Sequence, residues 1–149
     1  HAVLSRYLRS GVRSTHQVVT YLRRLGVSSN RVASLVADAR AHGLLDDHAA
    51  ARLWAAHWAR AGYAAAAIRL KLTAKGFPDD LIETTTARHV PPADDEARAR
   101  GLVSRRLARA TDRRTRTRLA RTLASRGFDS DVIERILSEP AESSESHVD

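Results

Sequence analysis

The residues of this 149-residue sequence that are best suited to chemistry are arginines gathered in one stretch. Residues 105–126 hold nine of them, and Asp112 is the only acid there. They are Arg105, Arg106, Arg109, Arg113, Arg114, Arg116, Arg118, Arg121 and Arg126. Because a guanidinium group presents a fixed fork of donors, such a cluster is suited to binding phosphates or carboxylates. The alternative is a face that is merely solvated.

Two smaller pairs of cations stand at related places earlier in the chain, Arg23 with Arg24 and Lys71 with Lys75. A solvated face explains these pairs as well as a binding role does. The candidate contacts to a partner or a nucleic acid are Arg23, Arg24, Lys71, Lys75, Arg113, Arg114, Arg116, Arg118, Arg121 and Arg126.

Trp54 and Trp58 are four residues apart, a spacing that places both side chains on one face of a helix. Two neighbouring indoles could form a stacking platform for bases. Core packing is the favoured interpretation, because Leu53 and Ala61 are expected on the same apolar face.

The polar residues do not indicate catalysis or metal binding. The seven histidines form no H-x-x-x-H pair and do not combine with carboxylates at metal spacing. Adjacent acids such as Asp46 and Asp47 stand where helices are expected to begin, so capping explains them. The sequence has no Walker loop, no G-x-G-x-x-G and no G-x-S-x-G. We therefore expect no enzyme, no cofactor, no catalytic residue and no metal site.

Composition restricts the class of protein further. The chain lacks cysteine, so disulfides and thiolate metal sites are excluded. A net charge of +8 favours an acidic partner, either nucleic acid or a protein with an anionic surface. No stretch approaches the roughly 20 apolar residues of a membrane span, and arginines interrupt any signal-peptide pattern. We expect a soluble cytoplasmic protein whose native sequence begins before His1.

The elements that must position these side chains follow from a unit that occurs three times. Segments 18–32, 68–82 and 119–133 align without gaps. Each has a leucine four residues before a glycine, and apolar residues eight before it, one after it and six after it. The glycines are Gly26, Gly76 and Gly127. Five matched columns in three copies indicate an internal repeat.

Each copy predicts a helix, a tight turn and a second helix. The apolar residues before the glycine share one helix face, and the glycine accepts the left-handed conformation that ends the helix. Capping residues then start the next helix, as in Ser28–Asn30. A further helix precedes each pair. In the first copy, residues Ser14–Gln17 have the pattern of a capping box, which would begin the helix before Gly26. Thr84–Thr86 is the only strand-like run, and we expect a frayed helix end there, before Pro91 and Pro92.

The predicted fold is therefore all-α, with three tandem three-helix repeats, about nine helices and no sheet. The predicted repeats span residues 1–44, 45–91 and 92–139, and a disordered acidic tail spans residues 140–149. Their net charges are +6, +1, +4 and −3 in that order. The outer repeats are therefore basic, and the middle repeat is nearly neutral.

Several short stretches of the sequence together resemble one known family. The most recognisable is the block Gly43-Leu44-Leu45-Asp46-Asp47. The others are Arg13-Ser14, Val18-Val19, residues 21–26, Gly62-Tyr63, residues 68–77, residues 119–128 and Val132-Ile133. On these stretches the sequence resembles the RecX family, which regulates the RecA recombinase, over roughly residues 2 to 138.

This resemblance implies an elongated, curved array that binds within the groove of the RecA–DNA filament. Lower recombinase, ATPase and coprotease activity of RecA would follow. It also implies possible direct contact with single- or double-stranded DNA, and we expect a monomer with no membrane partner. Two alternatives remain from the residues themselves: a generic basic helical nucleic-acid-binding module without a recombinase partner, and a scaffold whose basic surface keeps it soluble.

Overall fold

The computed structural model describes residues 2–138, and the predicted tail at 140–149 lies outside them. The described residues form nine α-helices, one 3-10 turn and no strand. The helices are α1 (Ala2–Arg9), α2 (Thr15–Arg24), α3 (Ser29–Ala41), α4 (Asp47–Arg60), α5 (Ala65–Ala74), α6 (Asp79–His89), α7 (Asp95–Leu107), α8 (Arg113–Ser125) and α9 (Ser130–Ser138), with the turn η1 (Pro92–Asp94) before α7. Among residues 2–138, no helix has the length and apolar character needed to cross a membrane.

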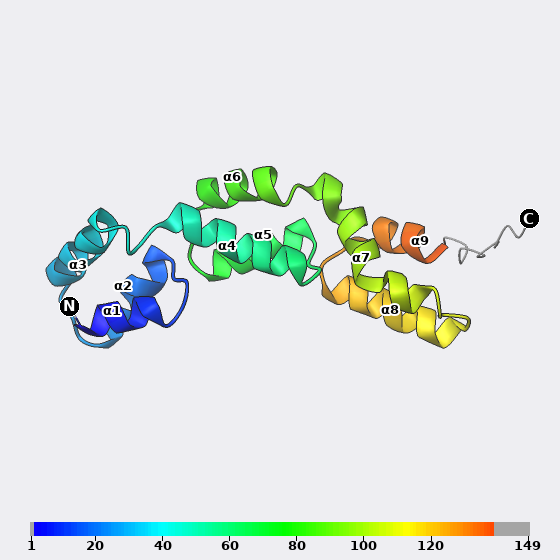
Figure 1. The fold of residues 1–149 in the computed structure, drawn as a ribbon, viewed down its shortest axis with the longest axis horizontal. Coiled ribbons are helices and arrows are strands. Elements are labelled where there is room, and N and C mark those ends of the chain that lie inside the picture. Colours follow the sequence, from blue (N-terminus) through cyan, green and yellow to red (C-terminus); the bar gives the residue numbers. More distant parts are fainter. Residues whose placement is uncertain (1, 139–149) are drawn as a thin grey trace, which may run out of the picture.

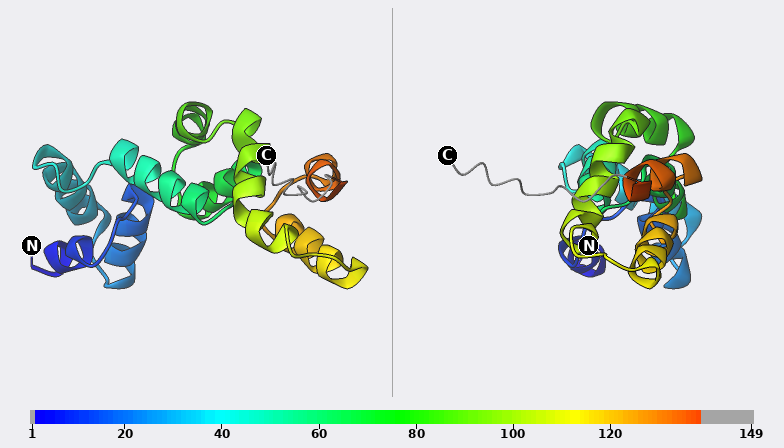
Figure 2. Two further views of the ribbon diagram at one scale, coloured as in Figure 1. Left: turned by 45° about the vertical axis from the view of Figure 1, so that its right-hand side comes forward. Right: turned by 90° about the vertical axis from the view of Figure 1, so that its right-hand side faces the viewer.

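The helices form three groups arranged one after another in an elongated arch (Figure 1). One end of the arch holds α1–α3, the middle holds α4–α6, and the other end holds α7–α9. In the left view of Figure 2 the groups again follow one another, and the right view looks along the long axis of the arch. The predicted all-α array of three-helix repeats is confirmed. The repeat boundaries at residues 44 and 91 stay a prediction.

Each group of three helices buries its own apolar cluster. The first cluster includes Val18 and Leu22, the second Ile68 and Leu72, and the third Leu119 and Leu123. These six side chains occupy the two columns that precede the repeat glycines, and each is at most 3% exposed. The two columns therefore form the buried face of the middle helix of each repeat, as the sequence predicts.

The repeat glycines end the middle helices as predicted. Gly26, Gly76 and Gly127 have φ values of 81°, 83° and 89°. The residue after each glycine donates its backbone N–H to the leucine carbonyl five residues earlier, at 3.1–3.3 Å. This hydrogen bond is typical of a Schellman turn, which satisfies carbonyls at a helix end and reverses the chain.

The predicted capping box at the start of α2 is confirmed. The Ser14 hydroxyl accepts a hydrogen bond from the Gln17 backbone N–H, at 3.1 Å. The Gln17 side chain accepts one from the Ser14 backbone N–H, at 3.0 Å. The two bonds satisfy donors that a helix start leaves without intrahelical partners.

The expectation of a frayed helix at Thr84–Thr86 is wrong. Helix α6 continues through these residues to His89. Thr85 and Thr86 are buried, and the Thr86 hydroxyl donates to the Ile82 carbonyl at 2.8 Å. Burial against the neighbouring helices therefore outweighs the low helix propensity of threonine.

Candidate partner-binding surface

The middle helices of neighbouring repeats meet end to end. The end of α5 contacts the start of α2, where the Ser14 hydroxyl donates to the Lys75 carbonyl at 2.5 Å. The end of α8 contacts the start of α5 in the same way, because the Ala64 N–H donates to the Arg126 carbonyl at 2.9 Å. The contact between the first and second repeats therefore recurs between the second and third repeats.

A carboxylate at the start of the following repeat strengthens each of these joints. Asp47, the first residue of α4, accepts from the Thr15 backbone N–H at 2.7 Å. Asp95, the first residue of α7, accepts from the Ala65 backbone N–H at 2.9 Å. Asp95 also pairs with Arg98 at 2.6 Å. The sequence indicated helix capping by such acids, but not that they would bind the preceding repeat.

Three of the candidate cations lie against aromatic rings. The Lys71 and Lys75 ammonium groups lie 4.4 Å from the ring centroids of Tyr63 and Trp54, respectively. The Arg126 guanidinium lies 4.4 Å from the centroid of Tyr63 and donates to the Ala61 carbonyl at 2.7 Å. These cation–π contacts stabilise the repeats and their joints. They leave these side chains less available to a partner.

A fourth candidate, Arg116, also has a partner within the fold. Its guanidinium donates to the Leu137 carbonyl, near the end of α9. This hydrogen bond joins α8 to α9 and satisfies a carbonyl that the helix end leaves unpaired. Arg116 is only partly exposed, in contrast to its arginine neighbours in α8.

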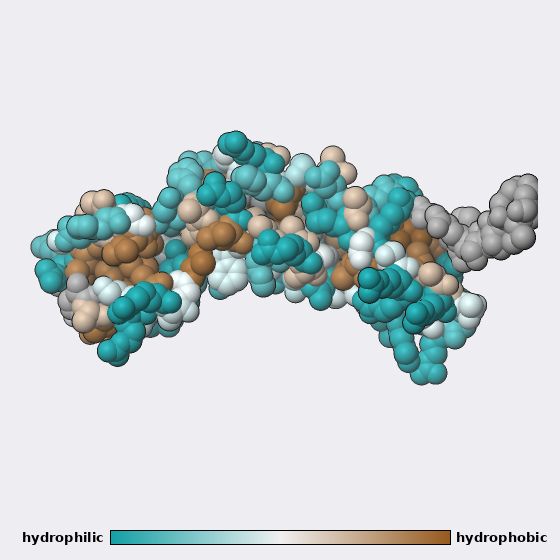
Figure 3. All heavy atoms as spheres, viewed as in Figure 1, coloured by the Kyte–Doolittle hydropathy of each residue, from teal (hydrophilic) through white to brown (hydrophobic). Residues whose placement is uncertain are grey.

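The other six candidates are exposed, and three of them form a row on α8. Arg114, Arg118 and Arg121 are spaced four and three residues apart, so they share the face opposite Leu119 and Leu123. We call these three the α8 arginine row. Within residues 2–138, no carboxylate forms an ion pair with any of them. Figure 3 shows a hydrophilic surface over α8.

The remaining exposed candidates are Arg113, Arg23 and Arg24. Arg113 is the first residue of α8, and Arg23 and Arg24 are in the last turn of α2, at the other end of the arch. The exposed arginines of the site thus occupy the two ends of the molecule. Sequence spacing placed them on helices but could not show this separation.

Asp112 holds the start of α8 in place. Its carboxylate accepts from the Thr115 backbone N–H at 2.7 Å, as an N-cap. Hydrogen bonds from the Thr115 side chain and then its backbone lower the pKa of the Asp112 carboxyl, and the charge of Arg118 contributes a smaller effect in the same direction. The only acid of the arginine cluster therefore has a structural role.

The indoles of Trp54 and Trp58 stack at a centroid distance of 5.0 Å. Trp58 is buried and Trp54 is partly buried against the second apolar cluster, which agrees with core packing. The expectation for Leu53 is wrong, because its side chain is 55% exposed. The small residues Ala51 and Ala55 form the buried face of α4 instead, since they let the neighbouring helices approach closely.

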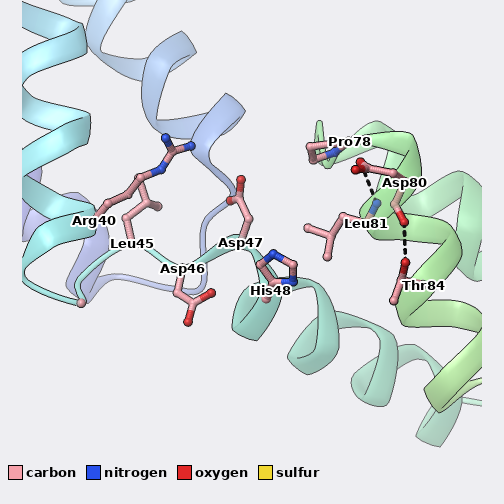
Figure 4. Close-up of a pocket in the computed structure, with 10 residues that line it drawn as sticks. Arg40, Leu45, Asp46, Asp47, His48, Pro78, Asp80, Leu81 and Thr84 are labelled. Atoms are coloured by element: carbon pink, nitrogen blue, oxygen red, sulfur yellow. Dashed lines mark hydrogen bonds between the residues drawn. The ribbon is translucent and has the colours of Figure 1, made fainter.

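A cleft of about 530 Å³ lies between the start of α4 and the start of α6 (Figure 4). Three carboxylates line it, those of Asp46, Asp47 and Asp80. Each already accepts a backbone N–H, from Ala49, Thr15 and Leu81 respectively. The Asp47 bond joins the first two repeats, whereas those of Asp46 and Asp80 are local within the second. Three carboxylates at one cleft disfavour phosphate.

Metal ligands are not gathered in the part of the chain that the structure describes. No three histidine or carboxylate side chains of residues 2–138 lie close enough together to hold a metal ion.

Comparison with known proteins finds similarity to RecX, both in the third repeat and over nearly the whole chain. Residues 94–137 match the family model for the third three-helix domain of RecX. The regulatory protein RecX of Thermobifida fusca (strain YX) is 29% identical over 152 residues, which cover 99% of this chain and 82% of that protein.

The chain is similar to RecX proteins, in its third repeat by the family model and over nearly its whole length by sequence.

Solved RecX structures share the fold of this chain. The crystal structure of RecX from Lactobacillus salivarius superposes with a TM-score of 0.73 at 18% identity, covering 91% of this chain and 90% of that one. A second crystal structure, of a regulatory protein RecX, gives a TM-score of 0.70 at 23% identity, covering 93% of this chain and 70% of that one. The α8 arginine row lies in the segment that matches the third RecX domain.

Proposed function

We propose that this chain binds the RecA–DNA filament and lowers the recombinase, ATPase and coprotease activities of RecA. The observation that carries the proposal is similarity to a regulatory protein RecX over nearly the whole chain, with a match of residues 94–137 to the third RecX domain. The arch adds support, because an elongated molecule with exposed arginines at both ends suits a long, repeating, anionic partner. In this proposal the chain acts as a monomer, in the cytoplasm.

The proposed contact surface consists of the six exposed candidates. The α8 arginine row spans about 10 Å along its helix, at 1.5 Å per residue, and can meet DNA phosphates or acidic side chains of RecA. Arg23, Arg24 and Arg113 extend the surface to both ends of the arch. Lys71, Lys75, Arg116 and Arg126 are assigned a structural role, because each is engaged within the fold.

The proposal is tested by comparing two partners in one binding assay. Fluorescently labelled chain is titrated with cognate RecA filaments on single-stranded DNA, held by a non-hydrolysable ATP analogue, and with the same DNA alone. We expect tighter binding to the filament across a range of salt concentrations. Equal or weaker binding to the filament would contradict the proposal.

The role of the α8 arginine row is tested by Arg114→Gln/Arg118→Gln/Arg121→Gln. The control is Arg31→Gln/Arg52→Gln/Arg88→Gln, which removes the same charge from three exposed arginines on other helices. We expect the first variant alone to weaken filament binding strongly. Equal losses in the two variants would show that net charge matters and that the row does not.

A second candidate function is generic binding of nucleic acid, which the unpaired arginines on α8 favour. A protein of this kind would bind naked DNA as tightly as the filament. Its affinity would fall steeply with salt, and loss of three phosphate contacts would reduce the slope of log K against log salt by about 2 on single strands. The same titrations therefore distinguish the two functions.

A further inference from the structure

A pocket of about 420 Å³ lies at the joint between the first and second repeats, away from the α8 arginine row. Its walls come from the connection between α1 and α2 on one side and from α4 on the other. The lining residues are Ser10, Gly11, Val12, Arg13, Leu53, Trp54 and His57. We call it the Leu53 pocket. The Trp54 indole N–H donates to the Val12 carbonyl at 3.3 Å and connects its two walls.

The apolar side chains of the Leu53 pocket face solvent. Leu53 is 55% exposed and Val12 is 37% exposed. Figure 3 shows apolar surface where the first group of helices meets the middle of the molecule. Exposed apolar side chains that line a concavity are typical of sites where a partner inserts an anchoring side chain.

The charged side chain that lines the pocket, Arg13, is positive. No acid is among its lining residues. The Arg13 guanidinium lies 4.4 Å from the centroid of Tyr7 and donates to the Ser10 hydroxyl at 3.1 Å, but its Nε is buried without an acceptor in the described structure. No carboxylate within residues 2–138 pairs with Arg13. This charge favours an occupant that brings a carboxylate.

The aromatic ring in the pocket is less suited to a nucleobase. The Trp54 ring already stacks on Trp58, at 5.0 Å, and the Lys75 ammonium lies 4.4 Å from its centroid. Base stacking requires an open aromatic face. The exposed apolar surface is instead aliphatic, from Leu53 and Val12, which suits a protein side chain.

We infer that the Leu53 pocket seats one large apolar side chain carried on an acidic segment of a partner protein. The inference rests on the proposed function, which makes RecA in its filament the protein concerned. An occupant would contact both walls, and hence both repeats, so its binding would also stabilise their relative placement. The Leu53 pocket would then recognise protein, while the α8 arginine row remains available to phosphates.

The first test substitutes Leu53→Ala, with Leu70→Ala as the matched control. Leu70 is 72% exposed and does not line the pocket, so both variants lose the same atoms from an exposed leucine. Binding is measured to cognate RecA filaments and to the same single-stranded DNA alone. We expect Leu53→Ala to weaken filament binding about tenfold, as for truncation of an anchoring side chain, and to leave binding to DNA unchanged.

The second test examines the acidic character of the occupant through His57→Glu and His57→Gln. His57 is exposed at the pocket, and the two variants differ only in one negative charge. We expect His57→Glu to bind filaments several-fold more weakly than His57→Gln. Equal affinities would overturn the inference that the occupant is acidic.

The outcomes separate this inference from the proposed function. If wild-type chain binds filaments and Leu53→Ala binds them equally well, the pocket inference is wrong and the proposed function stands. If Leu53→Ala weakens binding to naked DNA equally, the occupant is nucleic acid and the protein-side-chain inference is overturned. If wild-type chain does not prefer filaments to DNA, the proposed function fails, and the inference fails with it.

Discussion

Arginines from one stretch of sequence have two different roles in the folded chain. Arg126 is engaged by a carbonyl and an aromatic ring at the joint between the second and third repeats. Arg121, five residues earlier, is exposed on the opposite side of the helix from the core. A guanidinium that is already bonded within the fold contributes to stability, whereas an unpaired one on the surface is available for recognition.

This difference predicts unequal effects of alanine on stability. Arg126→Ala removes a hydrogen bond to Ala61 and the contact with Tyr63, so we expect a loss of about 1–2 kcal/mol in the free energy of unfolding. Arg121→Ala should change it by less than about 0.5 kcal/mol. Urea denaturation followed by circular dichroism measures both values. Equal losses would show that Arg126 does not stabilise the joint.

Residue types and spacing are sufficient to find the arginine cluster. They do not show which arginines are bonded within the fold and which are exposed. The spacing of Arg114, Arg118 and Arg121 fixes a common helix face, because an α-helix has a known period. What lies beside a side chain depends on the neighbouring repeat, which supplies the Ala61 carbonyl to Arg126. Leu53 was misassigned for the same reason, since only the packed structure shows which face of α4 the other helices cover.

At the scale of the element, the repeat glycines differ in what surrounds them. Gly26 and Gly127 both have left-handed φ values, at 81° and 89°. A Cβ added at Gly26 would meet nothing within 4 Å, whereas one at Gly127 would lie 2.6 Å from the Cβ of Ala67 in the preceding repeat. Gly26 therefore serves only to end its helix, whereas Gly127 also allows the second and third repeats to approach closely.

We predict that alanine at these two positions will have different costs. Gly26→Ala should lower the free energy of unfolding by about 1–2 kcal/mol, the cost of a left-handed alanine. Gly127→Ala should lower it by about 1–3 kcal/mol more, because the new methyl group overlaps Ala67. Chemical denaturation of both variants measures the difference. Similar losses would contradict the close approach at Gly127.

The Asp112 carboxylate at the start of α8 should make the stability of the folded chain depend on pH. The pKa of the Asp112 carboxyl is lowered by its hydrogen bonds to Thr115, so the ionised form stabilises the folded state. This contribution is complete above the ordinary carboxyl pKa and is lost as the pH falls through the lowered value. Asp112→Asn keeps a capping side chain without the charge.

Wild-type chain should therefore be more stable than Asp112→Asn at neutral pH, and the advantage should disappear in acid. Thermal unfolding of the two proteins between neutral pH and pH values below the carboxyl range measures this change. An advantage that is constant over the whole range would show that the charge of Asp112 does not contribute.

Local sequence predicted the elements well. The capping box at Ser14 and the glycine turns depend on hydrogen bonds between residues close in sequence, so short motifs determine them. The helix at Thr84–Thr86 was missed as a continuous element, because burial against α4 and α5 stabilises it. Tertiary packing outweighs propensity there.

At the scale of the whole molecule, two equivalent joints determine the arch. Asp47 and Asp95 each bind the first N–H of the middle helix in the preceding repeat. The periodicity of the sequence predicted three repeats, but it could not predict how they meet, because these hydrogen bonds join residues 30 and 32 positions apart. The joints hold the exposed arginines at opposite ends of an elongated body.

ATP hydrolysis by cognate RecA on single-stranded DNA, measured with increasing amounts of this chain, shows most directly whether the protein acts on the filament. We predict inhibition at amounts well below those that cover the DNA. We also expect that Arg114→Gln/Arg118→Gln/Arg121→Gln will require more protein for the same inhibition, while Arg31→Gln/Arg52→Gln/Arg88→Gln behaves as wild type. If hydrolysis is unaffected until the chain saturates the DNA, the protein acts on DNA alone and is not a filament-directed regulator.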